Sequence, residues 1–96
     1  MKLNLNYQIK DLNGKEITGE NGNASKALAG ALASANRGNA AKLMDWALKF
    51  WNLKPVELDK TDKEFIEAFI ETCETITALA KVSILNSIKD QYEKQK

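Results

Sequence analysis

The sequence has no histidine, one cysteine (Cys73), one proline and one arginine (Arg37). Without histidine, Ser-His and Cys-His nucleophilic catalysis and histidine-ligated zinc are excluded. A single thiol cannot form a disulfide within the chain, so a disulfide scaffold is excluded as well. Arginine is the usual reader of guanine edges and phosphate oxygens, and its scarcity counts against sequence-specific DNA binding.

Long apolar runs are missing too. The N-terminal segment alternates polar and apolar residues and lacks the continuous apolar stretch of about seven or more that a signal peptide needs. No run approaches the roughly eighteen apolar residues of a transmembrane helix. We therefore expect a cytoplasmic protein with no membrane partner, and the lone thiol agrees with a reducing compartment.

What is present is an ordinary globular balance: 96 residues, of which 44% are hydrophobic and 28% charged. This length predicts a single domain over residues 1–96. The net charge is +1, so no global field draws the protein to nucleic acid. The charge is uneven, however, because residues 1–54 hold eight basic and four acidic groups, whereas residues 55–96 hold six basic and nine acidic groups.

The N-terminal part predicts a β-hairpin over about 3–18. Residues 3–9 alternate between apolar and polar, which is typical of a half-buried strand. Asp11 and Gly14 then suit a type I turn followed by a left-handed glycine, with Ile9 opposite Ile17. A lone hairpin is marginal in water, so it must pack on the helices or pair with another chain.

Four helices are expected, at about 24–35, 40–52, 62–72 and 75–93. Asn23 suits the N-cap of the first, and Thr61 with Glu64 suits a capping box for the third. Gly30 lies inside the first helix, where close packing would explain it. Threonines near residues 72–77 favour a break there, although one long helix from 62 to 93 stays open. The fold class is α+β, predominantly helical: an N-terminal hairpin packed on a three- or four-helix bundle.

Glutamates at helical spacing form the most conspicuous charged group: Glu64, Glu67, Glu71 and Glu74. Paired carboxylates can perform acid–base chemistry or hold a metal. Here they lie opposite the apolar stripe without histidine or an Asn-Asp cluster, which favours a solvated face. We expect no enzyme activity, no catalytic residues, no metal, no cofactor and no small-molecule substrate.

The helix over 40–52 is the most informative segment, because apolar residues cover most of it. One interpretation places Trp46, Phe50 and Trp51 together in the core. The other leaves an apolar patch outside the core, since aromatic residues and methionine are enriched at protein interfaces. The residues of that candidate interaction site are Met44, Leu48, Trp51 and Leu53, with Val56 as a further extension.

Several segments together resemble a group of known sequences: the hairpin run KDLNGKEI (10–17), LMDWALKFWN (43–52) and LDKTD (58–62). They are similar to small uncharacterised proteins encoded in phage and prophage clusters. That resemblance implies an accessory or assembly protein, located in the bacterial host cytosol or within a phage assembly. It carries no known chemistry and implies no catalytic residue.

Two functions follow from the sequence. The first is a non-enzymatic protein-interaction or assembly protein that uses the apolar patch, with homodimerisation as its simplest form and the acidic segment 57–74 beside it. The alternative is a small nucleic-acid-binding regulator, which we consider the less favoured partner class. It would use the basic residues of the N-terminal half: Lys2, Lys10, Lys15, Lys26, Arg37, Lys42 and Lys49.

Overall fold

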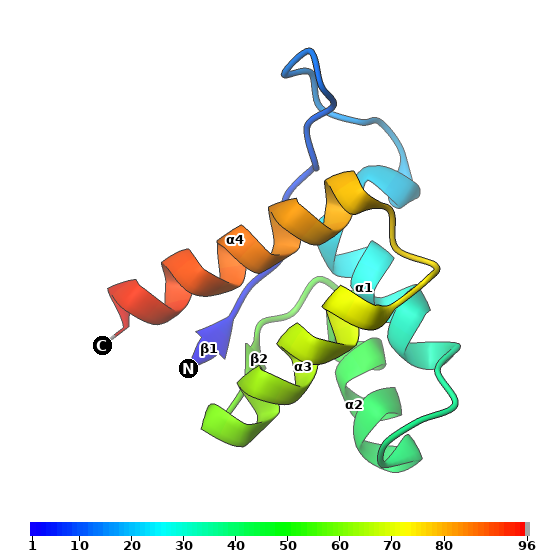
Figure 1. Ribbon diagram of the computed structural model, residues 1–96, viewed down its shortest axis with the longest axis vertical. Helices are drawn as coiled ribbons and strands as arrows, with labels where there is room; N and C mark the ends of the chain where they lie inside the picture. Colours follow the sequence, from blue (N-terminus) through cyan, green and yellow to red (C-terminus); the bar gives the residue numbers. More distant parts are fainter. Residues whose placement is uncertain (96) are drawn as a thin grey trace.

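The computed structural model describes residues 1–95, without the side chain of Asn21. It confirms a predominantly helical α+β architecture, with four helices and a two-stranded antiparallel sheet among the described residues (Figure 1). The elements in chain order are β1 (Lys2–Leu3), a 3-10 turn η1 (Glu20–Gly22), α1 (Ala24–Ala33), α2 (Ala40–Trp51), β2 (Val56–Glu57), α3 (Lys60–Thr72) and α4 (Ala78–Lys94).

Asparagine caps begin the first two helices. The Asn23 side chain accepts a hydrogen bond from the Lys26 amide at 3.1 Å, and Asn39 accepts one from the Lys42 amide at 3.2 Å. These bonds satisfy amides that have no partner within the helix. The two helices pack most extensively against each other, so α1 and α2 form one antiparallel hairpin of helices.

Helix α3 begins earlier than the sequence predicted, and the capping box of Thr61 and Glu64 is wrong. The N-cap is Asp59, whose side chain accepts from the Asp62 amide at 2.7 Å. The Asp62 side chain accepts in return from the Asp59 amide at 3.3 Å. Leu58, just before the cap, is buried and its amide bonds the Met1 carbonyl at 2.7 Å. Because this bond anchors the extended chain up to residue 58, the helix starts at Lys60.

The predicted break after residue 72 is confirmed. Cys73 has an extended backbone and the helix resumes at Ala78, where Thr77 is the N-cap and accepts from the Ala80 amide at 3.2 Å. Cys73 and Ile76 are buried, so the connecting segment is packed against the core. The Cys73 thiol forms a hydrogen bond of 3.1 Å with the Thr75 hydroxyl.

The hairpin turn forms in the predicted register. The Asp11 amide donates to the Lys15 carbonyl at 2.7 Å, the Ile17 amide donates to the Ile9 carbonyl at 2.8 Å, and Gly14 has a φ of 81°. The expected continuous strand from residue 3 is wrong, however. Chain direction changes at residues 5–7, where the Tyr7 amide bonds the Leu5 carbonyl at 2.8 Å.

The first strand therefore pairs elsewhere. β1 lies antiparallel to β2, with Leu3 opposite Val56 and Lys2 opposite Glu57. Leu3 and Val56 are both buried, and this burial selects the distant partner over the neighbouring return strand. The remaining hairpin tip is held by the Ile9 amide, which donates to the Gly22 carbonyl of η1 at 2.7 Å.

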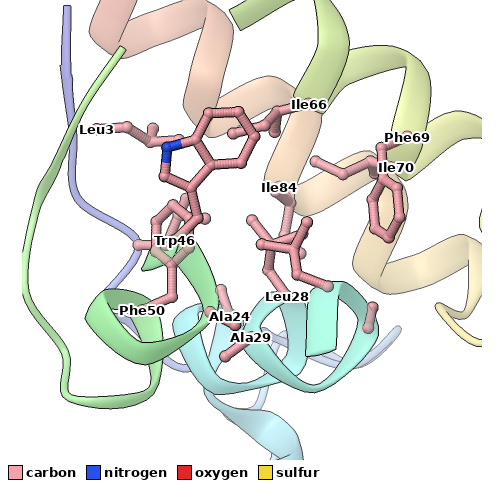
Figure 2. Close-up of a cluster of buried hydrophobic side chains, with 14 of the residues drawn as sticks. Leu3, Ala24, Leu28, Ala29, Trp46, Phe50, Ile66, Phe69, Ile70 and Ile84 are labelled. Atoms are coloured by element: carbon pink, nitrogen blue, oxygen red, sulfur yellow. The ribbon is translucent and has the colours of Figure 1, made fainter. Parts of the chain in front are cut away.

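The core draws on every helix and on β1 (Figure 2). Trp46 of α2 lies between Leu3 and Ile66 in this view, and Phe50 lies beneath it. Both aromatic side chains are buried, at 5% and 0% exposure. Burial of a large apolar side chain contributes roughly 1.5–3 kcal/mol, so this face of α2 is a main source of stability.

Candidate interaction surface

The outer face of α2 carries the exposed residues that the sequence singled out. Met44, Leu48 and Trp51 are spaced four and three apart, which places them on one side of the helix. They are 44%, 56% and 45% exposed, and Leu53 just beyond the helix is 36% exposed. We call Met44, Leu48, Trp51 and Leu53 the α2 patch.

The α2 patch accounts for most of the large apolar side chains that the described residues leave strongly exposed. Only Leu12, at the hairpin tip, and Val82, on α4, are exposed to a similar or greater degree. Val56 does not extend the patch, because it is 1% exposed inside β2. Of the two interpretations of Trp51, the structure supports the one outside the core.

Trp51 is held in place by its neighbours. The Lys26 ammonium lies 4.8 Å from the centre of the indole ring, and the Glu20 carboxylate lies 3.3 Å from that ammonium. A cation over an aromatic ring at an exposed site stabilises by roughly 0.5–1 kcal/mol. The ring also borders a groove of about 410 Å³ between α1 and the segment 75–80. Trp51 is therefore oriented by the fold while nearly half of its surface remains in water.

Leu53 has an unusual backbone conformation. Its φ is 61°, and among the described non-glycine residues no other has a positive φ. Its amide donates to the Phe50 carbonyl at 3.0 Å and the Lys54 amide donates to the Lys49 carbonyl at 2.9 Å. This is the helix-ending motif that normally has glycine at the left-handed position, where another residue costs about 1–2 kcal/mol. The left-handed turn at Leu53 therefore ends α2 at a cost in stability, and it leaves an apolar side chain exposed.

Gly30 also differs from the expectation. Close packing does not explain it, because a Cβ built at this position would meet no described atom within 4 Å, and the residue is exposed. It lines the groove that Trp51 borders. The glycine thus lowers the intrinsic stability of α1 without a compensating contact among the described residues.

Charged residues occupy the side of α2 that belongs neither to the core nor to the patch. The Lys49 ammonium lies 3.1 Å from the Asp45 carboxylate on the same helix. Lys42 forms an ion pair with Asp62 that joins α2 to α3. The hydrogen bond from Lys42 holds the pKa of Asp62 below its ordinary value, and the same bond raises the pKa of Lys42.

The acidic residues on α3 and just after it are solvated, as expected. Glu64, Glu71 and Glu74 are exposed, and Glu67 pairs with Lys63 at 2.9 Å. Within residues 1–95 no group of three or more histidine, cysteine, aspartate or glutamate side chains could hold a metal ion. In the same part of the chain, none of the helices combines the length and the apolar character needed to cross a membrane.

The basic residues proposed for nucleic-acid binding are largely engaged within the fold. Lys26, Lys42 and Lys49 each pair with a carboxylate. The Arg37 guanidinium donates to the Thr72 hydroxyl at 2.7 Å and to the Phe69 carbonyl at 2.9 Å. A phosphate ligand would have to compete with these partners, which weakens the nucleic-acid hypothesis.

Comparison with known proteins adds no assignment. No family model matches the chain, and neither the curated proteins nor the solved structures contain a significant match. The functional argument therefore rests on the geometry of this molecule.

Proposed function

We propose that this is a non-enzymatic interaction protein, acting in assembly or as an accessory factor, and that it docks through the α2 patch. The proposal rests on three exposed apolar side chains along one face of α2, together with the strained and exposed Leu53 just after the helix. A contiguous exposed apolar patch of this kind marks a protein contact site. The phage-associated role implied by the sequence resemblance is compatible with this proposal.

The simplest occupant is a second copy of the chain. Ala41, Met44, Leu48 and Trp51 follow the three-four spacing of a helix-pairing seam. In an antiparallel two-fold arrangement, Ala41 lies opposite Trp51 of the second copy and Met44 lies opposite Leu48. A small residue then faces the largest one. Asp45 and Lys49 beside the seam have opposite charges, so that flank adds no net repulsion.

The α2 patch has four residues, whereas each side of a standard interface has about 20–30 residues. We therefore expect a weak dimer that forms at roughly tens of micromolar. Sedimentation velocity over a concentration series tests this directly. The wild type should associate, whereas Leu48→Glu and Trp51→Ala should remain folded monomers. Leu48→Glu places a charge near the centre of the seam, and Trp51→Ala removes its largest apolar side chain.

Val82→Glu is the matched control, since Val82 is 59% exposed on α4 and Leu48 is 56% exposed on α2. The control should associate as the wild type does. A wild type that stays monomeric up to hundreds of micromolar contradicts the dimer. Equal loss of association in Leu48→Glu and Val82→Glu contradicts the assignment to the α2 patch.

A further inference from the structure

Two glutamine side chains cover the outer edge of β1. Gln95 accepts from the Lys2 amide and donates to the Lys2 carbonyl, both at 2.7 Å. Gln91 accepts from the Asn4 amide at 2.8 Å and donates to the Asn4 carbonyl at 2.7 Å. The four backbone groups that point away from β2 are thus bonded by side-chain amides, each of which imitates one residue of a neighbouring strand.

The two glutamines align with Lys2 and Asn4 because helices and strands have similar spacings along their axes. Residues four apart on a helix are separated by about 6 Å along its axis, and residues two apart on a strand by about 6.6 Å. Helix α4 runs beside β1 in Figure 1, so Gln91 and Gln95 meet Asn4 and Lys2 in turn. The Gln91 amide also donates to the Ser87 hydroxyl at 2.9 Å, which helps to orient it.

Without these amides, the β1 edge would be complementary to itself. An antiparallel two-fold pairing centred on Leu3 places Lys2 opposite Asn4 of a second copy. Opposed residues of this type exchange both of their backbone hydrogen bonds. That pairing would satisfy all four groups that the glutamines now satisfy, and it brings no two lysines opposite each other. Uncovered strand edges are templates for such pairing.

The C-terminal part of α4 is held mainly by polar contacts. Between Ile88, which is buried, and Gln95, where the described part ends, every residue is at least partly exposed. The Lys63 ammonium over the Tyr92 ring, at 4.5 Å, adds a further contact. Because little apolar surface is buried there, local opening of this part needs little free energy.

We propose that Gln91 and Gln95 form a latch that closes the β1 edge against antiparallel pairing with β1 of a second copy. The latch is independent of the α2 patch, which lies on a different helix. If both surfaces were open, each chain would offer two self-complementary sites and would assemble into an open-ended chain of copies. Closing one edge limits self-association to a single surface.

The test compares Gln91→Ala/Gln95→Ala with Lys89→Ala/Glu93→Ala, both in the Leu48→Glu background so that α2 pairing does not contribute. The control removes an exposed pair at the same spacing in the same turns and leaves the net charge unchanged. Alanine favours helix, so circular dichroism should be preserved. Sedimentation should show self-association of the glutamine variant at concentrations at least tenfold lower than in the control.

Amide hydrogen exchange at Lys2 and Asn4 supplies a second readout. These amides should exchange faster in the dilute glutamine variant than in the control and should become protected again as concentration rises. Adding Asn4→Pro, which removes one outward-pointing donor, should abolish the association. Should the double variant unfold, Gln95→Ala alone is measured instead, with faster exchange expected at Lys2 and unchanged exchange at Asn4.

Three outcomes would overturn the latch. The glutamine variant could remain as monomeric as the control, or its association could survive Asn4→Pro. Exchange at Lys2 and Asn4 could also be the same with and without the glutamines, which would mean that the side-chain bonds do not protect the edge.

Discussion

Gly22 is the glycine at which adding one methyl group should lower the stability of the fold most. A Cβ added there would lie 2.1 Å from the Ile17 carbonyl oxygen and 2.7 Å from its carbon. Both atoms belong to backbone, so no side chain can rotate away. To restore an ordinary contact, η1 and the hairpin would have to separate by roughly 1 Å, because packed protein interiors leave no spare room for the added atom.

That separation breaks the hydrogen bonds that dock the hairpin. The Ile9 amide bonds the Gly22 carbonyl at 2.7 Å, and the Ala24 amide bonds the Tyr7 carbonyl at 2.9 Å. With the 3.3 Å bond from the Gln8 side chain to the Gly19 carbonyl, three bonds are affected. At about 0.5–1.5 kcal/mol each, Gly22→Ala should lower the free energy of unfolding by about 2–4 kcal/mol.

For a domain of this size that loss corresponds to a fall in Tm of roughly 10–25 °C. Thermal unfolding followed by circular dichroism measures it, and amide exchange at Ile9 and Ala24, whose amides bond across this contact, shows whether the hairpin detaches. Gly30→Ala is the matched control, because no described atom lies within 4 Å of the added Cβ. It should raise the free energy of unfolding by up to about 1 kcal/mol. A Gly22→Ala protein that melts within about 2 °C of the wild type would refute the docking of the hairpin on η1.

Two further substitutions test individual features. Leu53→Ile keeps the apolar volume but places a β-branched residue at a φ of 61°. Chemical denaturation should therefore show a fall in the free energy of unfolding of about 1 kcal/mol, against a few tenths of a kcal/mol for Leu48→Ile within the helix. Equal falls for the two variants would contradict strain at Leu53. Lys42→Met removes the partner that lowers the pKa of Asp62. A lowered pKa stabilises the folded state at pH values above the ordinary aspartate pKa of about 3.9. The difference in unfolding free energy between the variant and the wild type should therefore be present near pH 6 and should shrink as pH falls below about 4. A difference that does not change with pH would contradict the ion pair.

Local structure could be predicted from the sequence where the interacting groups are close along the chain. The Asn23 cap and the turn from Asp11 to Gly14 each join residues three or four apart. The α3 cap shows the limit of this reasoning. Asp59 and Asp62 offered the same reciprocal pairing as Thr61 and Glu64, and the choice between them depended on Leu58, which is anchored by a bond to the first residue of the chain.

The sequence predicted part of the candidate site. Apolar spacing on α2 predicted one buried side and a surplus of exposed apolar residues, but periodicity alone could not decide whether Trp51 faced the core. Burial of Trp46 and Phe50 settled that orientation, because their side of the helix meets Leu3 and Ile66. The positive φ of Leu53 had no sequence signal, since leucine seldom adopts it.

By itself, then, the sequence determined the helical content, the helix breaks, the hairpin turn and the presence of an apolar surplus on α2, since each depends on neighbours within about one helical turn. Only the tertiary structure decided that β1 pairs with β2 and that Gln91 and Gln95 complete its outer edge. The glutamine bonds join residues 87 and 93 positions apart. Such pairings arise because burial of Leu3 and Leu5 brings the strand into the middle of the helices, and no local pattern encodes which distant groups it will meet there.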